Sequence, residues 1–137
     1  MTQMNADFKY GELTQKIIGV FFCVYNELGH GFLESVYHKS MCLALGEAGM
    51  AASSQIKIPV WFHGKIVGRF EADILVENCV LLELKAARAL DSSHEAQLLN
   101  YLRATEIEVG LLLNFGVNPK FKRLVYNNLA KKTSQSA

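Results

Sequence analysis

Apolar residues in the first third of the chain recur at helical spacing. They fall on one face of a helix that should begin near Glu12: Leu13, Ile17, Val20, Phe21, Val24 and Leu28. The glycines of LGHG, at 28–31, predict the end of this helix, because glycine readily adopts the backbone conformation of a helix C-cap. A second helix is predicted from about Leu33 to Glu47, before Gly49.

The period then changes from helical spacing to alternation, which is typical of strands. Alternating apolar positions predict a first strand: Ile56, Ile58, Val60 and Phe62. Pro59 favours an edge position for this strand, because proline has no N–H to donate to a neighbouring strand. The turn sequence HGK, at 63–65, is followed by apolar stretches that predict strands at about 66–76 and 80–86.

The C-terminal half should contain one more helix and one more strand. Ser92 and Glu95 form a capping-box pattern, which predicts a helix that continues to about Thr105. The apolar run EVGLLLNFG predicts a fourth strand, at about 107–114, that is buried on both faces. The pattern of KFKRLVYNNL, at 120–129, does not decide between a strand and a helix.

The predicted order of elements is helix, helix, three strands, helix, strand. The strand–helix–strand step should form a right-handed parallel crossover, whereas the preceding strands should pair as antiparallel hairpins. These connections predict an α/β fold (α+β mixed sheet) with a central sheet of about four strands flanked by helices. We expect one domain over residues 1–137, with a loose leader at 1–10 and a loose tail at 131–137.

The composition is that of an ordinary globular protein, with 50% hydrophobic and 20% charged residues. The formal net charge of +1 gives no overall attraction to nucleic acid or membranes, so nucleic-acid binding would need a local basic patch. The three cysteines are widely separated and include no CxxC pair, which argues against a disulfide framework, a structural zinc or an iron–sulfur cluster. They indicate a reducing, cytoplasmic environment. The most apolar run, at 17–25, is too short to span a bilayer.

Charged residues interrupt the two apolar strands in FEADILVENCVLLELKAA, at 70–87. Glu83 and Lys85 are two residues apart and therefore share a face of their strand. Asp73 lies across from Glu83 on the same face only if the strands are joined by a three-residue loop at 77–79. A two-residue turn would put the two acids on opposite faces. We predict the three-residue loop, or a bulge with the same effect.

Two opposed carboxylates repel each other unless a cation lies between them. Mg²⁺ suits such a place, because it binds one or two carboxylates, keeps several waters and accepts phosphate oxygens. The metal would polarise a phosphodiester and lower the pKa of a bound water, while Lys85 could orient that water or neutralise developing charge. Asp73, Glu83 and Lys85 therefore suit metal-assisted phosphodiester hydrolysis. The structural alternative is a solvated strand face, the usual origin of a Glu-x-Lys pair.

Two helical stretches offer partners for this cluster. Glu34 and Tyr37 share a face of the second helix, and Glu34 in its first turn also suits the positive end of the helix. His94, Gln97 and Tyr101 line one face of the later helix. These three residues could hydrogen-bond a phosphate, or they could form only the polar boundary of the core. The residues alone leave both alternatives open.

The same residues form an ordered series of motifs: Gly31-x-x-Glu34-x-x-Tyr37, Asp73, Glu83-Leu84-Lys85-Ala86, His94-x-x-Gln97-x-x-x-Tyr101 and Asn114-Phe115-Gly116. This series resembles the GxxExxY protein family, which belongs to the PD-(D/E)xK nuclease superfamily, over roughly residues 12–126. The resemblance implies a restriction-endonuclease-like core, a mixed sheet flanked by helices.

The resemblance also implies roles for the individual residues. Glu34, Asp73 and Glu83 would hold Mg²⁺ or Mn²⁺, and Lys85 would be catalytic. Gln97 and Tyr101 match a Q-x-x-x-Y motif of related nucleases that helps to position the site and the DNA. Gln97 is accordingly expected among the catalytic residues, and a substrate-binding role is expected for Tyr37, His94 and Tyr101.

Two functions follow from these expectations. The first is a Mg²⁺- or Mn²⁺-dependent nuclease that acts on DNA, and the second is a catalytically silent module of the same fold that binds nucleic acid or protein. A small-molecule phosphodiesterase is a weaker third. A homodimer or a partner protein could supply the grip on substrate that the net charge lacks. A basic C-terminal cluster could also supply it, unless it is a solvated terminal face: Lys120, Lys122, Arg123, Lys131 and Lys132.

Overall fold

Two helices precede the sheet, at the positions that the apolar spacing predicts. The computed structural model describes residues 10–131, so most of the predicted leader and tail lies outside the described residues. α1 spans Gly11–Leu28 and α2 spans Glu34–Glu47. The chain turns after α1 at Gly29, whose φ of 68° is easily adopted by a residue without a Cβ atom.

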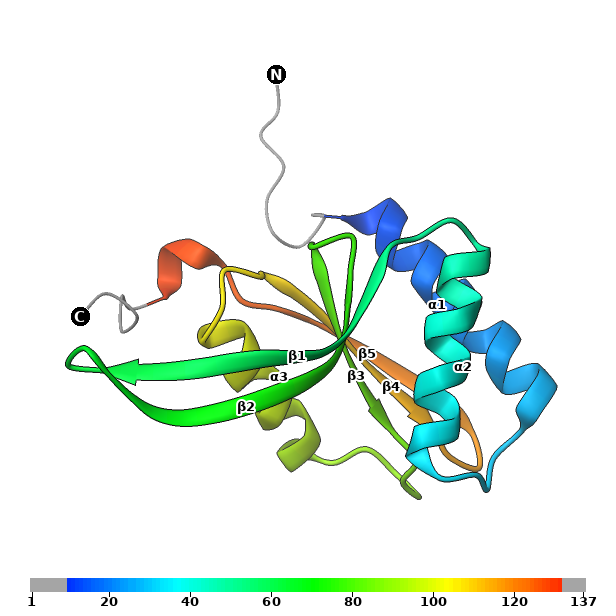
Figure 1. Cartoon of the computed structure of the whole chain (residues 1–137). Coiled ribbons are helices and arrows are strands. Elements are labelled where there is room, and N and C mark those ends of the chain that lie inside the picture. Colours follow the sequence, from blue (N-terminus) through cyan, green and yellow to red (C-terminus); the bar gives the residue numbers. More distant parts are fainter. Residues whose placement is uncertain (1–9, 132–137) are drawn as a thin grey trace.

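The strands form one mixed sheet. Its members are β1 (Ala52–Phe62), β2 (Lys65–Val76), β3 (Val80–Lys85), β4 (Val109–Phe115) and β5 (Pro119–Val125). Helix α3 (Ser92–Arg103) joins β3 to β4, and a short 3-10 helix, η2 (Asn128–Ala130), follows β5. The strands lie in the order β1-β2-β3-β4-β5 (Figure 1). Only β3 and β4 are parallel to each other, which confirms the predicted mixed sheet and its parallel crossover.

The number of strands differs from the prediction of about four. The stretch whose type the sequence left open forms β5, which pairs with β4 from Phe115–Pro119 to Val109–Val125. β4 is buried along its whole length, as its apolar run predicts. β1 lies at the other edge of the sheet, which confirms the edge position predicted from Pro59.

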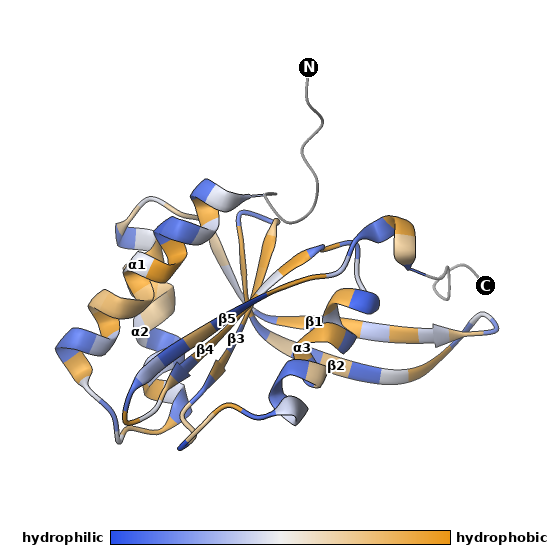
Figure 2. Ribbon diagram, turned by 180° about the vertical axis from the view of Figure 1, so that it is seen from behind, coloured by the Kyte–Doolittle hydropathy of each residue, from blue (hydrophilic) through white to orange (hydrophobic). Residues whose placement is uncertain are grey.

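The sheet separates two hydrophobic clusters. One is formed with α1 and α2 and contains Phe21, Tyr37 and Leu84, and the other is formed with α3 and contains Leu98 and Leu112. Hydrophobic residues accordingly lie on the helix surfaces that face the central strands (Figure 2). Within residues 10–131, no helix is both long enough and apolar enough to cross a membrane.

The connection between β2 and β3 is the predicted three-residue loop. Val76 pairs with Val80 and Ile74 pairs with Leu82, so residues 77–79 form the turn. One further step along this register would place Asp73 opposite Glu83. The β2–β3 pairing ends at Ile74, however, because the course of β2 changes at Asp73.

Asp73 marks an irregularity in β2. Ala72 packs in the α3-side cluster, whereas Ile74 packs in the cluster formed with α1 and α2. Residues two apart on a regular strand share a face, so the alternation breaks at Asp73. The facing residue of β1 is Gln55, whose φ of 55° lies in the left-handed region. This local distortion allows the Asp73 side chain to leave the face that regular alternation would assign to it.

Candidate active site

The carboxylate of Asp73 lies between neighbouring strands rather than on one face of the sheet. Its Oδ2 atom accepts a hydrogen bond of 2.7 Å from the backbone N–H of Leu84 in β3. Its Oδ1 atom lies 3.9 Å from Nδ1 of His38, which extends from α2. Asp73 therefore links the two sides of the sheet, at the place where the β2–β3 pairing ends.

Glu83 is a buried carboxylate with an unmet hydrogen-bonding need. It is 4% exposed, and its parallel partner in β4 is Leu112, which places it on the α3 side of the sheet. Its Oε1 atom is the only buried side-chain nitrogen or oxygen within residues 10–131 that lacks a hydrogen-bond partner. Burial first, and then the negative charge of Asp73, raise the pKa of Glu83 from 4.5 to about 8. A buried carboxylate without a hydrogen-bond partner lowers the stability of the folded protein.

The positive charge of Lys85 partly compensates the negative charge of Glu83. Its Nζ atom lies 3.7 Å from Oε2 of Glu83, and the positive charge acts to lower the pKa that burial raises. The two side chains are only 18% and 5% exposed, so the pair is largely shielded from water. The structure thus brings together Asp73, Glu83 and Lys85, the three residues singled out from the two apolar strands.

Helix α3 brings two further predicted residues to the same side. Nε2 of Gln97 donates a hydrogen bond of 2.8 Å to the hydroxyl of Tyr101. Burial raises the pKa of Tyr101, and the charge of Glu83 raises it further, so this hydroxyl lies within the electrostatic field of the buried acid. The ring of Tyr101 also packs against Phe70 of β2, with 5.5 Å between centroids.

Glu34 approaches Asp73 from the α2 side. It lies in the first turn of α2 and lines a hollow of about 170 Å³ together with Ser35, His38, Asp73 and Leu84. Leu84 faces the α1–α2 cluster, so Glu34 reaches Asp73 from the side of the sheet opposite to Glu83.

His38 is a residue of this hollow that the sequence did not single out. Besides its approach to Asp73, its Nε2 atom is hydrogen-bonded to the hydroxyl of Ser54 in β1, at 2.5 Å. His38 has no zinc-ligand spacing to another histidine in the sequence. Its position one helical turn after Glu34 is the signal that could have placed it beside the same site.

Two predicted substrate-binding residues, Tyr37 and His94, make contacts within the fold. Tyr37 is fully buried, and its ring stacks on Phe115 with 4.3 Å between centroids. Its hydroxyl donates to the carbonyl of Gly29 at 2.6 Å and accepts from the N–H of Phe32 at 3.2 Å. These two hydrogen bonds fix the loop before α2.

His94 belongs to the cap of α3. Its Nδ1 atom accepts a hydrogen bond of 3.1 Å from the N–H of Asp91, while Asp91 Oδ1 accepts from the N–H groups of Ser93 and His94. The helix is therefore capped by Asp91, and the predicted Ser92–Glu95 capping box is wrong by one residue. Asp91 caps the helix in place of Ser92, because its ionised carboxylate is a stronger acceptor than a serine hydroxyl for the N–H groups that begin the helix.

Asn114 and Gly116 hold the chain that follows Lys85. The Asn114 side chain accepts from the N–H of Ala87 at 2.9 Å and donates to its carbonyl at 3.0 Å. Gly116 permits this close approach, because a Cβ atom there would lie 2.3 Å from the Ala87 carbonyl oxygen. The Asn-Phe-Gly motif therefore fixes the end of β3 and, with it, the backbone from which Lys85 projects.

The basic C-terminal cluster is less available than its sequence indicates. Lys122 pairs with Glu95 of α3 at 2.9 Å. Nζ of Lys131 donates to the carbonyls of Thr105 and Ile107, and burial lowers its pKa. Lys132 lies outside the described residues. Much of this cluster stabilises the fold, so the structure offers little support for a continuous phosphate-binding patch here.

A divalent cation fits the donor set at the centre of the site. Oε1 of Glu83 lacks a partner, and the neighbouring charge of Asp73 disfavours ionisation of Glu83. A hard cation held by Glu83 and Asp73 would remove both penalties. The predicted third ligand, Glu34, is not part of a compact set: no three His, Cys, Asp or Glu residues lie close enough to hold a metal within the described residues.

Comparisons with known proteins agree with this geometry. The family model of the PD-(D/E)XK nuclease superfamily matches residues 11–124, which is most of the chain. No curated protein sequence matches. The crystal structure of SSO0001 is similar in fold, with a TM-score of 0.55 and 19% sequence identity. That match covers 68% of this chain but only 50% of the SSO0001 chain, so the chain spans about half of that protein.

Proposed function

Because the chain belongs to the PD-(D/E)XK nuclease superfamily, we propose that it hydrolyses phosphodiester bonds of DNA with the help of Mg²⁺ or Mn²⁺. The observation that carries the proposal is the buried, unpartnered Oε1 of Glu83 beside Asp73, with Lys85 on the same strand face. A solvated strand face would not bury such an atom. The GxxExxY pattern at residues 31–37 supports assignment to that family within the superfamily.

The proposal assigns a role to each residue of the site. Asp73 and Glu83 would hold the metal, with Glu34 approaching from α2 as a further acid. When bound, the ion would polarise the phosphodiester and lower the pKa of a water. Lys85 would donate hydrogen bonds to the phosphate and neutralise charge that develops on it, in a position largely shielded from water. Gln97 would orient the hydroxyl of Tyr101 toward this centre.

The second candidate function, a catalytically silent binding module, is favoured by one observation. The described residues contain no preassembled set of three metal-binding side chains, although two-carboxylate sites also bind Mg²⁺. The two candidates differ in whether metal binding depends on Asp73 and Glu83, and in whether a metal-dependent cut can be measured.

The deciding experiment is cleavage of labelled single- and double-stranded DNA and RNA with Mg²⁺ or Mn²⁺, with Lys85→Ala as the variant. We expect metal-dependent cleavage of DNA, and a loss of about 10²-fold or more in the variant, because one general acid–base or electrostatic contact is worth that much. Lys57→Ala is the matched control, because Lys57 is an exposed strand lysine that pairs with Glu71, away from Glu83.

The outcomes separate the two candidates. Equal cleavage by wild type and Lys85→Ala would indicate a contaminant or a different site and would refute the proposed one. Absence of cleavage by either protein, together with calorimetry that shows no Asp73-dependent Mn²⁺ binding, would favour the silent module. Cleavage of RNA alone would correct the proposed substrate.

A further inference from the structure

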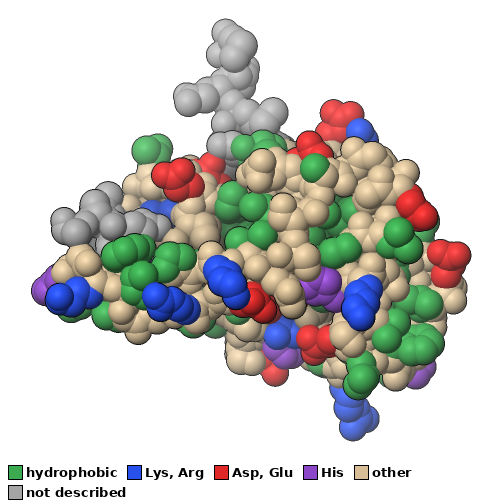
Figure 3. All heavy atoms as spheres, in the orientation of Figure 1, with side chains coloured by type: hydrophobic (Ala, Val, Ile, Leu, Met, Phe, Trp, Pro, Cys, Tyr) green, Lys and Arg blue, Asp and Glu red, His purple; other side chains and the backbone are tan. Residues whose placement is uncertain are grey.

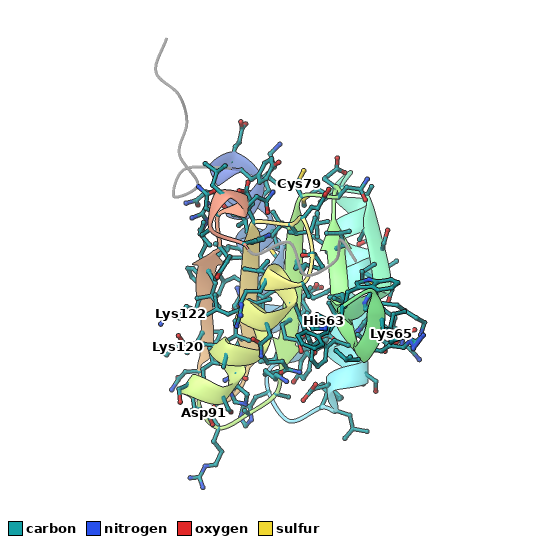
Figure 4. The ribbon with its side chains drawn as sticks, turned by 90° about the vertical axis from the view of Figure 1, so that its left-hand side faces the viewer. His63, Lys65, Cys79, Asp91, Lys120 and Lys122 are labelled. Atoms are coloured by element: carbon teal, nitrogen blue, oxygen red, sulfur yellow. The ribbon has the colours of Figure 1, made fainter. Side chains whose placement is uncertain are left out.

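A second hollow lies at the end of β3. Three connecting segments meet there: the α1–α2 connection, the residues that follow β3, and the β4–β5 turn (Figure 1). Figure 4 shows Asp91, where the segment after β3 enters α3, at the opposite end of the molecule from Cys79 of the β2–β3 turn. The hollow has a volume of about 220 Å³, and we call it the end hollow. Its lining includes Phe32, Ala86, Arg88, Phe115 and Val117.

Each wall of the end hollow is fixed by a side chain from another part of the chain. The Tyr37 hydroxyl accepts a hydrogen bond from the N–H of Phe32 at 3.2 Å. The Tyr25 hydroxyl donates to the carbonyl oxygen of Val117 at 2.6 Å. Asn114 makes the two hydrogen bonds that hold the segment after β3. The end hollow is therefore preformed, and a ligand would bind there with little cost in ordering the protein.

Exposed apolar side chains border the end hollow. Phe32 is 48% exposed and Val117 is 60% exposed. The ring of Phe32 packs edge-to-face with Tyr37, with 6.1 Å between centroids, and Tyr37 in turn stacks on Phe115. The Phe32 ring is thus held by the core and still half open to solvent. A fixed aromatic ring of this kind offers a stacking platform to an aromatic group of a ligand.

The end hollow also favours a negatively charged ligand. Arg88 is exposed and makes no ion pair with any described residue. None of the described residues that line the end hollow is acidic. Figure 3 shows hydrophobic side chains exposed at the lower right of the molecule, with a basic side chain projecting from the lower edge beside them. A guanidinium group open to solvent suits a phosphate, which it can bind through two parallel hydrogen bonds.

The end hollow adjoins the hollow of the candidate active site that Glu34 lines. Leu84 lines that hollow and Ala86 lines the end hollow, two residues further along the chain. On the other wall, Glu34 and Phe32 are likewise two residues apart. A ligand that extends beyond the end hollow would therefore reach the candidate active site directly.

On the basis of the proposed function, we propose that the end hollow binds one unpaired nucleobase of the substrate strand. The base would stack on Phe32, and Arg88 would bind a phosphate of the same strand. A volume of 220 Å³ is below the roughly 300–1,000 Å³ of sites for drug-sized ligands, which suits a single base. Lys85 directly precedes Ala86 but shares the α3-side face with Glu83, so the bound nucleotide would flank the bond that is cut.

Other occupants satisfy only part of this chemistry. An apolar side chain of a protein partner would cover Phe32 and Val117 but would leave Arg88 without an anion. The phosphates of a duplex would satisfy Arg88, but its bases are already stacked and paired, so none would enter the hollow. Two copies of this chain that met through their end hollows would bring two like charges together. An unpaired base with its phosphate satisfies both the ring and the cation.

The test is binding without cleavage. Fluorescence anisotropy of labelled oligo(dT) in EDTA measures the affinity at several salt concentrations. Phe32→Leu should weaken binding by at least about fivefold at fixed salt, through loss of base stacking, whereas Phe32→Trp should preserve it. Arg88→Gln should reduce the slope of log affinity against log salt by about 0.7, because one phosphate contact fewer releases counterions.

Two matched controls lie away from the end hollow. Phe62→Leu removes a ring that is 57% exposed on β1, and Arg103→Gln removes an exposed charge from the last turn of α3. Both variants should bind oligo(dT) like wild type. An abasic strand of the same length is the control ligand. It should bind wild type and Phe32→Leu equally, because it has no base to stack on the ring.

Several results would overturn the proposal. One is equal behaviour of the end-hollow and control variants, and another is the absence of oligo(dT) binding by wild type. Tighter binding of a duplex, independent of Phe32, would overturn it in favour of phosphate contacts alone. A dimer abolished by Phe32→Leu in sedimentation would overturn it in favour of a second copy.

The same variants keep this inference separate from the proposed function. Binding that depends on Phe32 and Arg88, in a protein that cuts nothing with Mg²⁺ or Mn²⁺, would support the base site and refute the nuclease. Normal cleavage by Phe32→Leu and Arg88→Gln, at substrate concentrations below saturation, would support the nuclease and refute the base site.

Discussion

Replacing Glu83 with glutamine should make the metal-free protein more stable near neutral pH. Burial and the charge of Asp73 raise the pKa of Glu83 from 4.5 to about 8. Between these values the folded protein retains a proton that the unfolded chain has released, so stability falls as pH rises. Each pH unit in this window changes the free energy of unfolding by about 1.4 kcal/mol. From pH 5 to pH 7 the loss is about 3 kcal/mol.

Glutamine keeps the shape of the side chain without its charge. The variant should therefore lack this part of the pH dependence, and its advantage over wild type should grow from pH 5 to pH 7 by about 3 kcal/mol. Urea unfolding in EDTA, followed by circular dichroism at both pH values, measures the difference. Glu27→Gln is the control, because it makes the same replacement at an exposed position on α1, away from Asp73 and Lys85.

Bound metal should reverse the stability advantage of Glu83→Gln over wild type. A cation that binds only the folded protein stabilises it, by about 2.7 kcal/mol at a hundred times its dissociation constant. Mn²⁺ should therefore stabilise wild type more than Glu83→Gln at pH 7. Parallel pH profiles for the two proteins would refute the idea that Glu83 is a strained acid. Equal stabilisation of both by Mn²⁺ would refute its role as a metal ligand.

Three further variants test the residues around this acid. Tyr37→Phe should lower the free energy of unfolding in urea by about 1–2 kcal/mol, because the Tyr37 hydroxyl holds the Gly29 carbonyl. The KM for DNA should stay unchanged, and a raised KM with normal stability would contradict this role. Gly116→Ala should lower the melting temperature by several degrees, because the added Cβ would lie 2.3 Å from the Ala87 carbonyl oxygen. An unchanged melting temperature would contradict this close approach. Gln97→Ala should reduce kcat without unfolding the protein, and normal cleavage would remove Gln97 from the site.

The elements of the fold could be predicted where one periodicity dominated. Helical spacing located α1 and α2, and alternation located the strands up to β3, because local burial alone decides these patterns. β5 could not be assigned, since its alternation is broken by consecutive charges at Lys122 and Arg123. Its identity as a strand depends on pairing with β4, a long-range contact that no local pattern contains.

The difference between local patterns and long-range contacts also explains which parts of the site could be predicted. The loop at 77–79 decides the register of β2 and β3, so a turn-length argument could place the two acids near each other. It could not reveal that β2 loses its regular alternation at Asp73, because the cause includes the left-handed backbone of Gln55 on another strand. His38 was missed for a related reason: its approach to Asp73 depends on how α2 packs against the sheet.

The cost of the buried acid explains why so many contacts converge on its surroundings. Glu83 opposes folding at neutral pH, so its strand must be held by interactions that do not involve its charge. Asp73 supplies one by accepting from the Leu84 N–H, and Asn114 supplies two by holding Ala87 beyond the end of β3. These bonds act on the backbone between Glu83 and Lys85 and just beyond Lys85. A site formed only by chance packing could relax by exposing Glu83, whereas the backbone of this one is held at Leu84 and at Ala87. That rigidity is the physical reason to expect a ligand that stabilises the charge, and a divalent cation is the ligand whose chemistry fits.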